Sequence, residues 1–386
     1  MASFPDISTF VGTETQLKLA IDHGATHLIF EDSKLSARSY TNDFKIPHFD
    51  KLIEWATLAR DLNPHITLSF NLDILVHHRH FPLIKKLITS LQQAQIDTVR
   101  VQDQGMAIYL KELMPELKCQ LATETGNQKL NSIGYYAPLF DRQILSNEMP
   151  YSELKKTIDS YPAHAFEIQV HGPLLIQYSN RRYMAGQEEE PESVIIKVAQ
   201  DQQYPNRHYP FYDNEHGHFM FLYFDRCLLP YIQDLNSLSL SGWLIDGRGE
   251  SEAYLTSALS AFRRYRDNPN LAFNAEDLTP LTETAQRPLK GGFFRANKTD
   301  QDRSTVVKDM PGHTFVGTVI HTESKKRFCV DLISPVKLGD SLRILTPEGI
   351  QTDFVIDSME ELGDSLTLFP WKKGIVTQSK LFIKHD

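Results

Sequence analysis

The feature that most constrains this chain is a repeated alternation of short apolar runs with helical patterns between residues 8 and about 250. Strands that alternate with helices at this spacing pair in parallel through right-handed crossovers. Eight such units favour a (β/α)8-type, TIM-like barrel over residues 1–267, and a doubly wound open α/β sheet is the alternative. Strands are expected at 8–13, 25–32, 65–71, 97–103, 118–124, 141–146, 166–170 and 242–246. Helices are expected at 14–23, 49–61, 81–94, 106–113, 152–160 and 251–265.

The pattern changes after the last of these helices. Residues 268–312 contain an acidic, Pro- and Thr-rich stretch at 274–288 and the pair Gly291-Gly292, which are typical of an irregular connector. From 313 to 386, short alternating runs are separated by turns such as Leu338-Gly339-Asp340. This second pattern predicts a small C-terminal all-β barrel domain.

Composition excludes several classes of protein. Of the 386 residues, 41% are hydrophobic and 23% are charged, as in soluble globular proteins. The formal net charge of -9 excludes a global basic field for nucleic acid but leaves room for a local basic patch. The three cysteines form no C-x-x-C pair, which indicates a reducing compartment. We see no signal peptide and no apolar run long enough to span a bilayer, so a cytoplasmic location is expected.

Polar side chains follow several of the expected strands, and in a barrel such positions face one mouth. His171 ends the strand at 166–170, where it could carry a proton or serve only as a structural histidine. Arg248 could bind a phosphate or carboxylate group through its guanidinium, or pair with Asp246 or Glu250.

Carboxylates and amides occupy equivalent positions. Glu124 and Glu148 could perform acid–base work, and Asp103 could join them at the mouth. These acids could equally balance arginines in a static network. Asn71 could bind a ligand or act as a turn residue. The candidate set is His171, Glu124 and Glu148 for catalysis, and Arg38, Asn71, Asp103, Tyr178, Arg182 and Arg248 for ligand binding.

Metal and protease motifs are weak in this sequence. The clusters at 77–80 and 216–218 are rich in histidine, but their spacing is not that of a zinc site, and a solvated turn or helix start is the better interpretation. We therefore predict no metal ligands there. Neither G-x-S-x-G nor H-E-x-x-H occurs, which gives peptidase chemistry little support.

Several stretches resemble one known family. In the segment 166–182, Glu167, Gly172 and Leu174 lie in register with the signature of the collagenase-like peptidase U-32 family. Further fragments at 11–30, 36–38, 68–71, 101–105 and 245–248 resemble other stretches of the family in the same order. The resemblance covers nearly the whole chain.

The resemblance implies a set of activities. Members of the family hold an iron–sulfur cluster with four cysteines, and some hydroxylate a pyrimidine in tRNA or ribosomal RNA, with prephenate implicated. Others act in ubiquinone hydroxylation, and older descriptions call them collagenase-like peptidases. The family's usual cysteine positions hold Leu175 and Arg182 here, the third position near 191–196 has no cysteine, and only Cys227 matches. Because thiolates are the usual ligands of such a cluster, we predict that none binds.

These observations lead to one favoured function and two alternatives. The favoured function is an RNA-modification protein of the pyrimidine hydroxylation type, which binds an anionic ligand or nucleotide at the barrel mouth without an iron–sulfur cluster. RNA is then the expected partner, with the small β-barrel helping to hold it. The first alternative is a non-catalytic binding or scaffold protein with a protein partner. The second is a collagenase-like peptidase.

Overall fold

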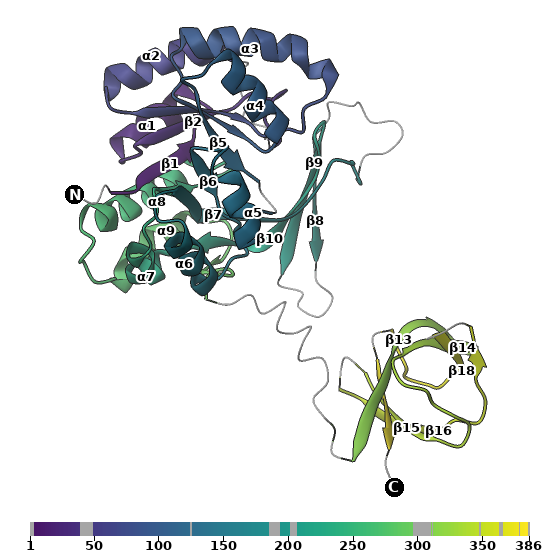
Figure 1. Cartoon of the computed structure of the whole chain (residues 1–386). Coiled ribbons are helices and arrows are strands. Elements are labelled where there is room, and N and C mark those ends of the chain that lie inside the picture. The colour runs from purple at the N-terminus through teal and green to yellow at the C-terminus, as the bar shows by residue number, and fades with distance from the viewer. Residues whose placement is uncertain are drawn as a thin grey trace. The chain divides into compact units, whose positions relative to one another are not determined.

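The computed structural model divides the chain into two compact units, 1–297 and 298–386, which we describe separately (Figure 1). The structure describes residues 4–38, 49–123, 126–184, 194–200, 207–295, 310, 312–346, 349–362, 366–377 and 379–384.

Eight parallel strands form the centre of the first unit. They pair in the order β1-β2-β3-β4-β5-β6-β7-β11, and β11 also pairs in parallel with β1, so the sheet closes on itself. The predicted TIM-like barrel is confirmed, and the open sheet is not the fold. The strands are β1 (Asp6–Phe10), β2 (His27–Phe30), β3 (Thr67–Leu72), β4 (Thr98–Val101), β5 (Lys118–Ala122), β6 (Arg142–Ile144), β7 (Ala165–Ser179) and β11 (Gly242–Ile245).

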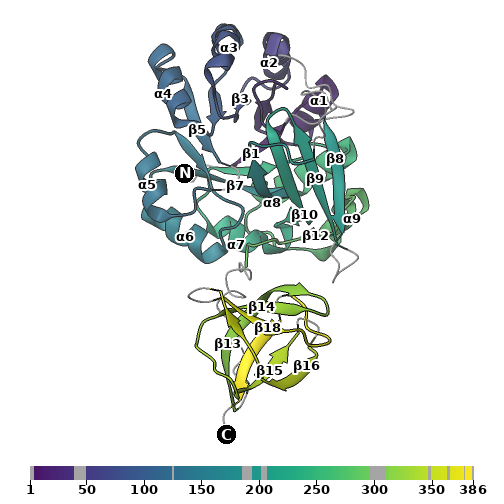
Figure 2. The same ribbon diagram turned by 90° about the vertical axis from the view of Figure 1, so that its right-hand side faces the viewer.

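Helices cover the outside of these strands (Figure 2). Local sequence sets where they begin: the Thr13 hydroxyl accepts a hydrogen bond from the backbone N–H of Gln16 and caps the first helix, and Ser251 caps the eighth in the same way. The helices are α1 (Glu14–Asp22), α2 (Leu52–Leu62), α3 (Phe81–Gln93), α4 (Gln104–Leu113), α5 (Leu130–Tyr136), α6 (Tyr151–Ser160), α7 (Ile232–Ser237), α8 (Glu252–Asp267) and α9 (Thr279–Thr284). Short 3-10 turns occur at Phe49–Lys51, His78–His80, Leu229–Tyr231 and Ala275–Leu278. Among the described residues, no helix is both long and apolar enough to cross a membrane.

Strand β7 departs from the expectation that His171-Gly172 ends it. It continues to Ser179 and leaves the barrel to pair with the antiparallel strand β10 (Gly217–Cys227). Gly172 has a φ of 116°, so the strand can bend there and continue. Tyr178 and Ser179 therefore lie on a strand that extends beyond the barrel. The sheet continues through β9 (His208–Asn214) and β8 (Ile195–Gln200), and β12 (Leu289–Lys290) pairs with β10.

The second unit is an antiparallel all-β domain, as its alternating pattern predicted. Its strands pair in the order β16-β15-β19-β13-β14-β18-β17 around a core that includes Val319, Phe328 and Ile344. The strands are β13 (His313–Glu323), β14 (Arg327–Leu332), β15 (Ser341–Leu345), β16 (Gln351–Val355), β17 (Glu360–Glu361), β18 (Leu366–Pro370) and β19 (Lys380–Lys384).

Candidate functional site

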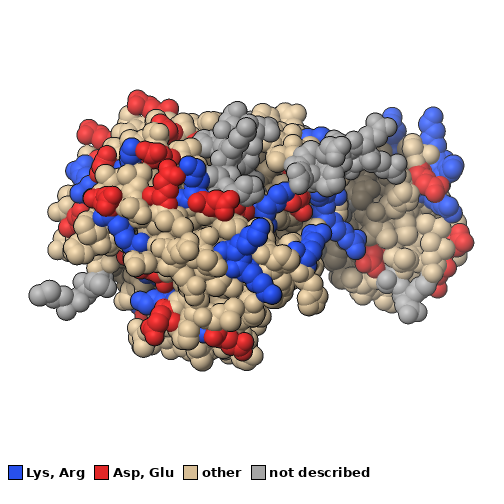
Figure 3. All heavy atoms as spheres, turned by 90° about the horizontal axis from the view of Figure 1, so that it is seen from above, with Lys and Arg blue, Asp and Glu red and all other residues tan. Residues whose placement is uncertain are grey.

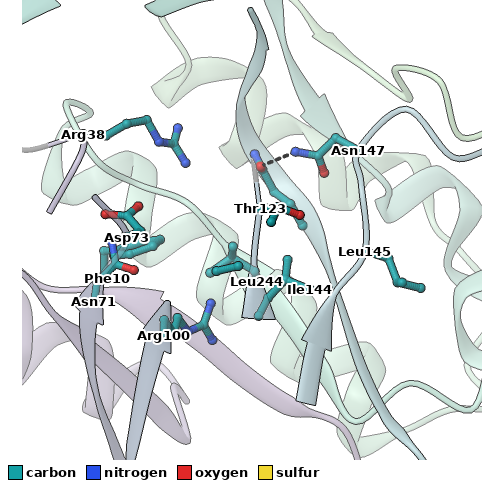
Figure 4. A pocket seen from close by; sticks show the side chains of 12 residues that line it. Phe10, Arg38, Asn71, Asp73, Arg100, Thr123, Ile144, Leu145, Asn147 and Leu244 are labelled. Atoms are coloured by element: carbon teal, nitrogen blue, oxygen red, sulfur yellow. Dashed lines mark hydrogen bonds between the residues drawn. The ribbon is translucent and has the colours of Figure 1, made fainter. Parts of the chain in front are cut away.

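A narrow pocket lies at the carboxyl ends of the barrel strands, where barrel enzymes carry their sites (Figure 4). Its cavity volume is about 30 Å³. A cavity of that size holds roughly two ordered waters. The lining residues are Phe10, Arg38, Asn71, Asp73, Arg100, Ala122, Thr123, Ile144, Leu145, Asn147, Gln169 and Leu244.

Asp246, directly after β11, joins two arginines at this mouth. Its carboxylate accepts from Arg38 Nη2 at 2.9 Å, and from Arg248 Nε at 2.9 Å and Nη2 at 2.7 Å. All three side chains are at most 6% exposed. Burial opposes ionisation of Asp246, but the two guanidinium groups outweigh it and hold the pKa of this carboxyl well below its ordinary value.

Glu31, directly after β2, holds the other side of Arg248. Its Oε1 accepts from Arg248 Nη1 at 2.8 Å and from Asn71 Nδ2 at 2.8 Å. Burial, assisted by the negative charges of Asp73 and Asp246, raises the pKa of Glu31 to about 7 in spite of Arg248. This carboxyl is therefore a group at the mouth that can exchange a proton near neutral pH.

A second ionic layer lies among the strands of the barrel. Arg100 Nη2 on β4 lies 2.8 Å from Glu167 Oε1 on β7, and Arg142 Nη1 lies 3.2 Å from Glu167 Oε2. Ser8 also donates to Glu167, at 2.9 Å. Burial and the nearby Arg100 and Arg142 lower the pKa of His27 well below its ordinary value, so this ring is neutral. Arg100 also lines the mouth pocket, so the layer connects directly to it.

The opposite wall of the pocket carries amides. Asn147 Nδ2 donates to Gln169 Oε1 at 3.0 Å, the contact drawn as a dashed line in Figure 4. Behind Asn147, Arg226 of β10 donates from Nη1 to Asn147 Oδ1 at 2.9 Å. The hydroxyl of Thr123 is buried and has no hydrogen-bond partner in the structure. Thr123 and Asn147 therefore offer polar groups to a ligand, whereas the Gln169 amide nitrogen already donates to the Pro173 carbonyl oxygen at 2.9 Å.

Three of the residues predicted from the sequence meet at the mouth. Arg38 and Asn71 line the pocket, and Arg248 contacts both Asp246 and Glu31. The arginines are held by carboxylates, but these are Asp246 and Glu31, and of the two only Asp246 was expected, as a partner of Arg248.

Other predicted residues lie apart from the pocket lining. Asp103 accepts from the backbone N–H of Met106 and caps α4. Glu148 is half-buried and accepts from Gln128 Nε2 at 2.9 Å. His171 packs against Tyr254 of α8, with ring centroids 4.9 Å apart. Burial lowers the pKa of His171 to about 3, and neither ring nitrogen has a hydrogen-bond partner in the structure.

The remaining predicted residues lie on or beyond the extension of β7. The Tyr178 hydroxyl donates to the His216 carbonyl at 3.1 Å, and burial raises the pKa of Tyr178 to about 12. Arg182 is half-buried just after the strand. Glu124 lies outside the described residues.

Sequence reasoning missed several residues of the site. Glu31 and Asp73 follow strand ends, and that position was available as a signal. Arg100 and Gln169 lie inside strands, where an inward-facing polar residue breaks the apolar pattern. Arg226 belongs to an antiparallel strand outside the barrel, and nothing in its local sequence pointed to the mouth.

Only one of the resembling family's cysteine positions holds a cysteine in this chain, Cys227. Cys227 pairs with His171 across β7 and β10, Leu175 pairs with Phe221, and burial raises the pKa of the Cys227 thiol to about 12. Within the described ranges, no group of three or more His, Cys, Asp or Glu residues is placed to hold a metal ion. These residues do not fit a four-thiolate cluster.

The surface carries charges of both signs. Figure 3 shows Lys and Arg interspersed with Asp and Glu over the face that it presents. A chain of net charge -9 with this distribution has no uniform basic field on that face.

Comparisons with known proteins agree with the sequence resemblance. The chain is 20% identical to "tRNA hydroxylation protein P" of Escherichia coli over 95% of this chain and 91% of that protein. It is 20% identical to "tRNA hydroxylation protein P1" of Bacillus subtilis, covering 89% and 84%. Among solved structures, TrpF from Jonesia denitrificans matches with a TM-score of 0.37 and 12% identity, over 69% of this chain and all of that one. The model of peptidase family U32 matches residues 12–304, so this chain belongs to peptidase family U32.

Proposed function

We propose that this protein takes part in RNA pyrimidine hydroxylation and binds an anionic ligand or nucleotide group in the mouth pocket. The observation that carries the proposal is the pocket itself, which is lined by Arg38 and Arg100 at the carboxyl ends of the strands. The names of the curated relatives, which align with nearly the whole chain, supply the RNA substrate.

We also propose that the chain works without an iron–sulfur cluster. Four thiolates are needed, and the sequence offers three cysteines, of which Cys329 lies in the second unit. Conversion of a pyrimidine C–H to C–OH is a two-electron oxidation. A protein without a redox centre must receive the oxidant from its ligand or from a partner, so the barrel's role is to bind and orient. An iron and acid-labile sulfide assay on anaerobically purified protein tests this point; stoichiometric iron and sulfide would contradict it.

The function is tested by mass spectrometry of RNA from a strain that lacks the gene. We expect one hydroxylated pyrimidine to disappear and to return with the wild-type gene. Complementation with Thr123→Val should fail, because this change removes a hydroxyl from the pocket lining. The fold should stay intact, because that hydroxyl has no hydrogen-bond partner in the structure. Thr89→Val, at an exposed position of α3, is the matched control and should complement. An unchanged set of hydroxylated pyrimidines in the deletion strain would refute the proposal.

A non-catalytic binding protein is the second candidate. It is favoured by the carboxylates of Asp246 and Glu31, which already neutralise Arg38 and Arg248. Under this reading no small anion should stabilise the protein in a thermal-shift experiment. Peptidase activity has less support, because Thr123 is the one hydroxyl among the pocket-lining residues and they include no cysteine.

A further inference from the structure

Arg226 differs from the other arginines at the barrel mouth. Its side chain is buried, with 1% relative exposure, and it pairs with no carboxylate of the described residues. Nη1 donates to Asn147 Oδ1 at 2.9 Å and lies 3.5 Å from the Asn147 carbonyl, but Nε and Nη2 have no hydrogen-bond partner in the structure. Arg38, Arg100 and Arg248 each contact a carboxylate.

Packing does not account for this buried charge. A guanidinium without a counter-charge is costly in a dry interior, and its usual remedy is a carboxylate or a bound anion. The ring of Phe294 lies 5.9 Å from the guanidinium carbon, which gives only a weak cation–π contact at the limit of its range. Two N–H-bearing nitrogens would still have no acceptor.

The position of Arg226 connects its charge to the pocket. Asn147 and Gln169 line the pocket, and Arg226, which is not among the lining residues, donates a hydrogen bond to Asn147. By occupying Asn147 Oδ1, Arg226 fixes the orientation of this amide, so that Nδ2 is directed at Gln169. A group bound beside these amides would therefore lie one side chain away from a positive charge that no described carboxylate neutralises.

We propose that Arg226 is the anchoring charge for an oxyanion, a carboxylate or phosphate group, bound beside Asn147 and Gln169 in the mouth pocket. This inference rests on the proposed function, and it assigns the selection for negative charge to Arg226, because Arg38 and Arg100 in the pocket lining already contact carboxylates. The carboxylate of Asp73 lines the same pocket. The ligand's anionic end is therefore directed to the Asn147 side, and a hydrogen-bond donor of the ligand to Asp73.

Two variants of the full-length protein test the role of Arg226. Arg226→Met keeps the stem and removes the charge, and Asn147→Asp supplies the missing counter-charge within the protein. Calorimetric titration and thermal shift would use inorganic phosphate and malonate as separate probes. We expect one of them to bind the wild type, and both variants to bind it at least about 30-fold more weakly. Without anion, Asn147→Asp should melt at a higher temperature than the wild type.

The outcomes separate the possibilities. Stabilisation by malonate alone identifies a carboxylate ligand, and stabilisation by phosphate alone identifies a phosphate group. Arg295→Met, at an exposed arginine, is the control and should respond as the wild type does. Equal binding by the wild type and Asn147→Asp, or no response of the wild type to either anion, would overturn the inference. The RNA phenotype of the deletion strain is read independently, so the proposed function can fail while Arg226 still binds an anion, and the reverse.

Discussion

Asp246 offers the sharpest test of the ion pairs at the barrel mouth, because its buried carboxylate contacts two buried arginines, Arg38 and Arg248. The change to Asn keeps the volume of the side chain and removes its charge. Arg38 and Arg248 then lose the charge that they share, although Arg248 keeps Glu31 at 2.8 Å. Removing one partner of a buried ion pair typically costs about 3–5 kcal/mol, and because the contact to Glu31 remains we expect a loss of about 3 kcal/mol.

Urea unfolding measures this loss directly. The chain has three tryptophans, and Trp55 and Trp243 belong to the first unit whereas Trp371 belongs to the second. In a Trp371→Phe background, tryptophan fluorescence therefore reports on the barrel alone. Asp159→Asn removes an exposed i,i+4 pair with Lys155 and is the matched control, with an expected change below about 0.5 kcal/mol. A loss below about 1 kcal/mol for Asp246→Asn would refute the claim that this carboxylate holds the mouth together.

Three further predictions follow from the same region. Burial raises the pKa of Glu31 to about 7, so its contribution to stability is full below pH 4.5 and is lost as the pH rises through 7. Between pH 5 and pH 8 the unfolding free energy of the wild type should therefore fall by about 2.5 kcal/mol relative to that of Glu31→Gln. Parallel curves of unfolding free energy against pH for the two proteins would contradict this. The unfolding free energy of His171→Phe should be no more than about 1 kcal/mol below that of the wild type, since no hydrogen bond is lost, and the variant should complement the deletion strain. Loss of function in a folded variant would support a catalytic role for His171. Gly172→Ala should lower the unfolding free energy, measured by urea unfolding, by more than about 2 kcal/mol. The reason is that a Cβ there would lie 2.1 Å from the Asp246 carbonyl oxygen. An unchanged unfolding free energy would show that the strand can shift to make room.

The bend at Gly172 shows how far local pattern could be used. The segment 166–170 was recognisable as a strand, but its continuation to Ser179 depends on β10, a partner about 50 residues further along the chain. The pairing of β7 with β11 contains a register shift between Leu244 and Ile245, and Ile245 pairs with His171. A strand's alternation assigns side chains to a face only while the register is regular. For that reason His171 could be placed at a strand end from the sequence, but not on the side of the sheet where it lies.

What the sequence by itself determined was the barrel and the end of the barrel at which the candidate pocket lies. Both follow from local periodicity, because strand–helix alternation leaves few topologies and parallel strands bring their carboxyl ends together. Only the tertiary structure decided which charges neutralise one another. Arg38 and Asp246 are 208 residues apart, and Arg226 reaches Asn147 across 79 residues. Charges interact through space over a few ångströms, and the sequence does not give those distances. Two arginines with similar local sequence patterns can therefore differ, one paired with a carboxylate as Arg38 is, and the other buried without one as Arg226 is.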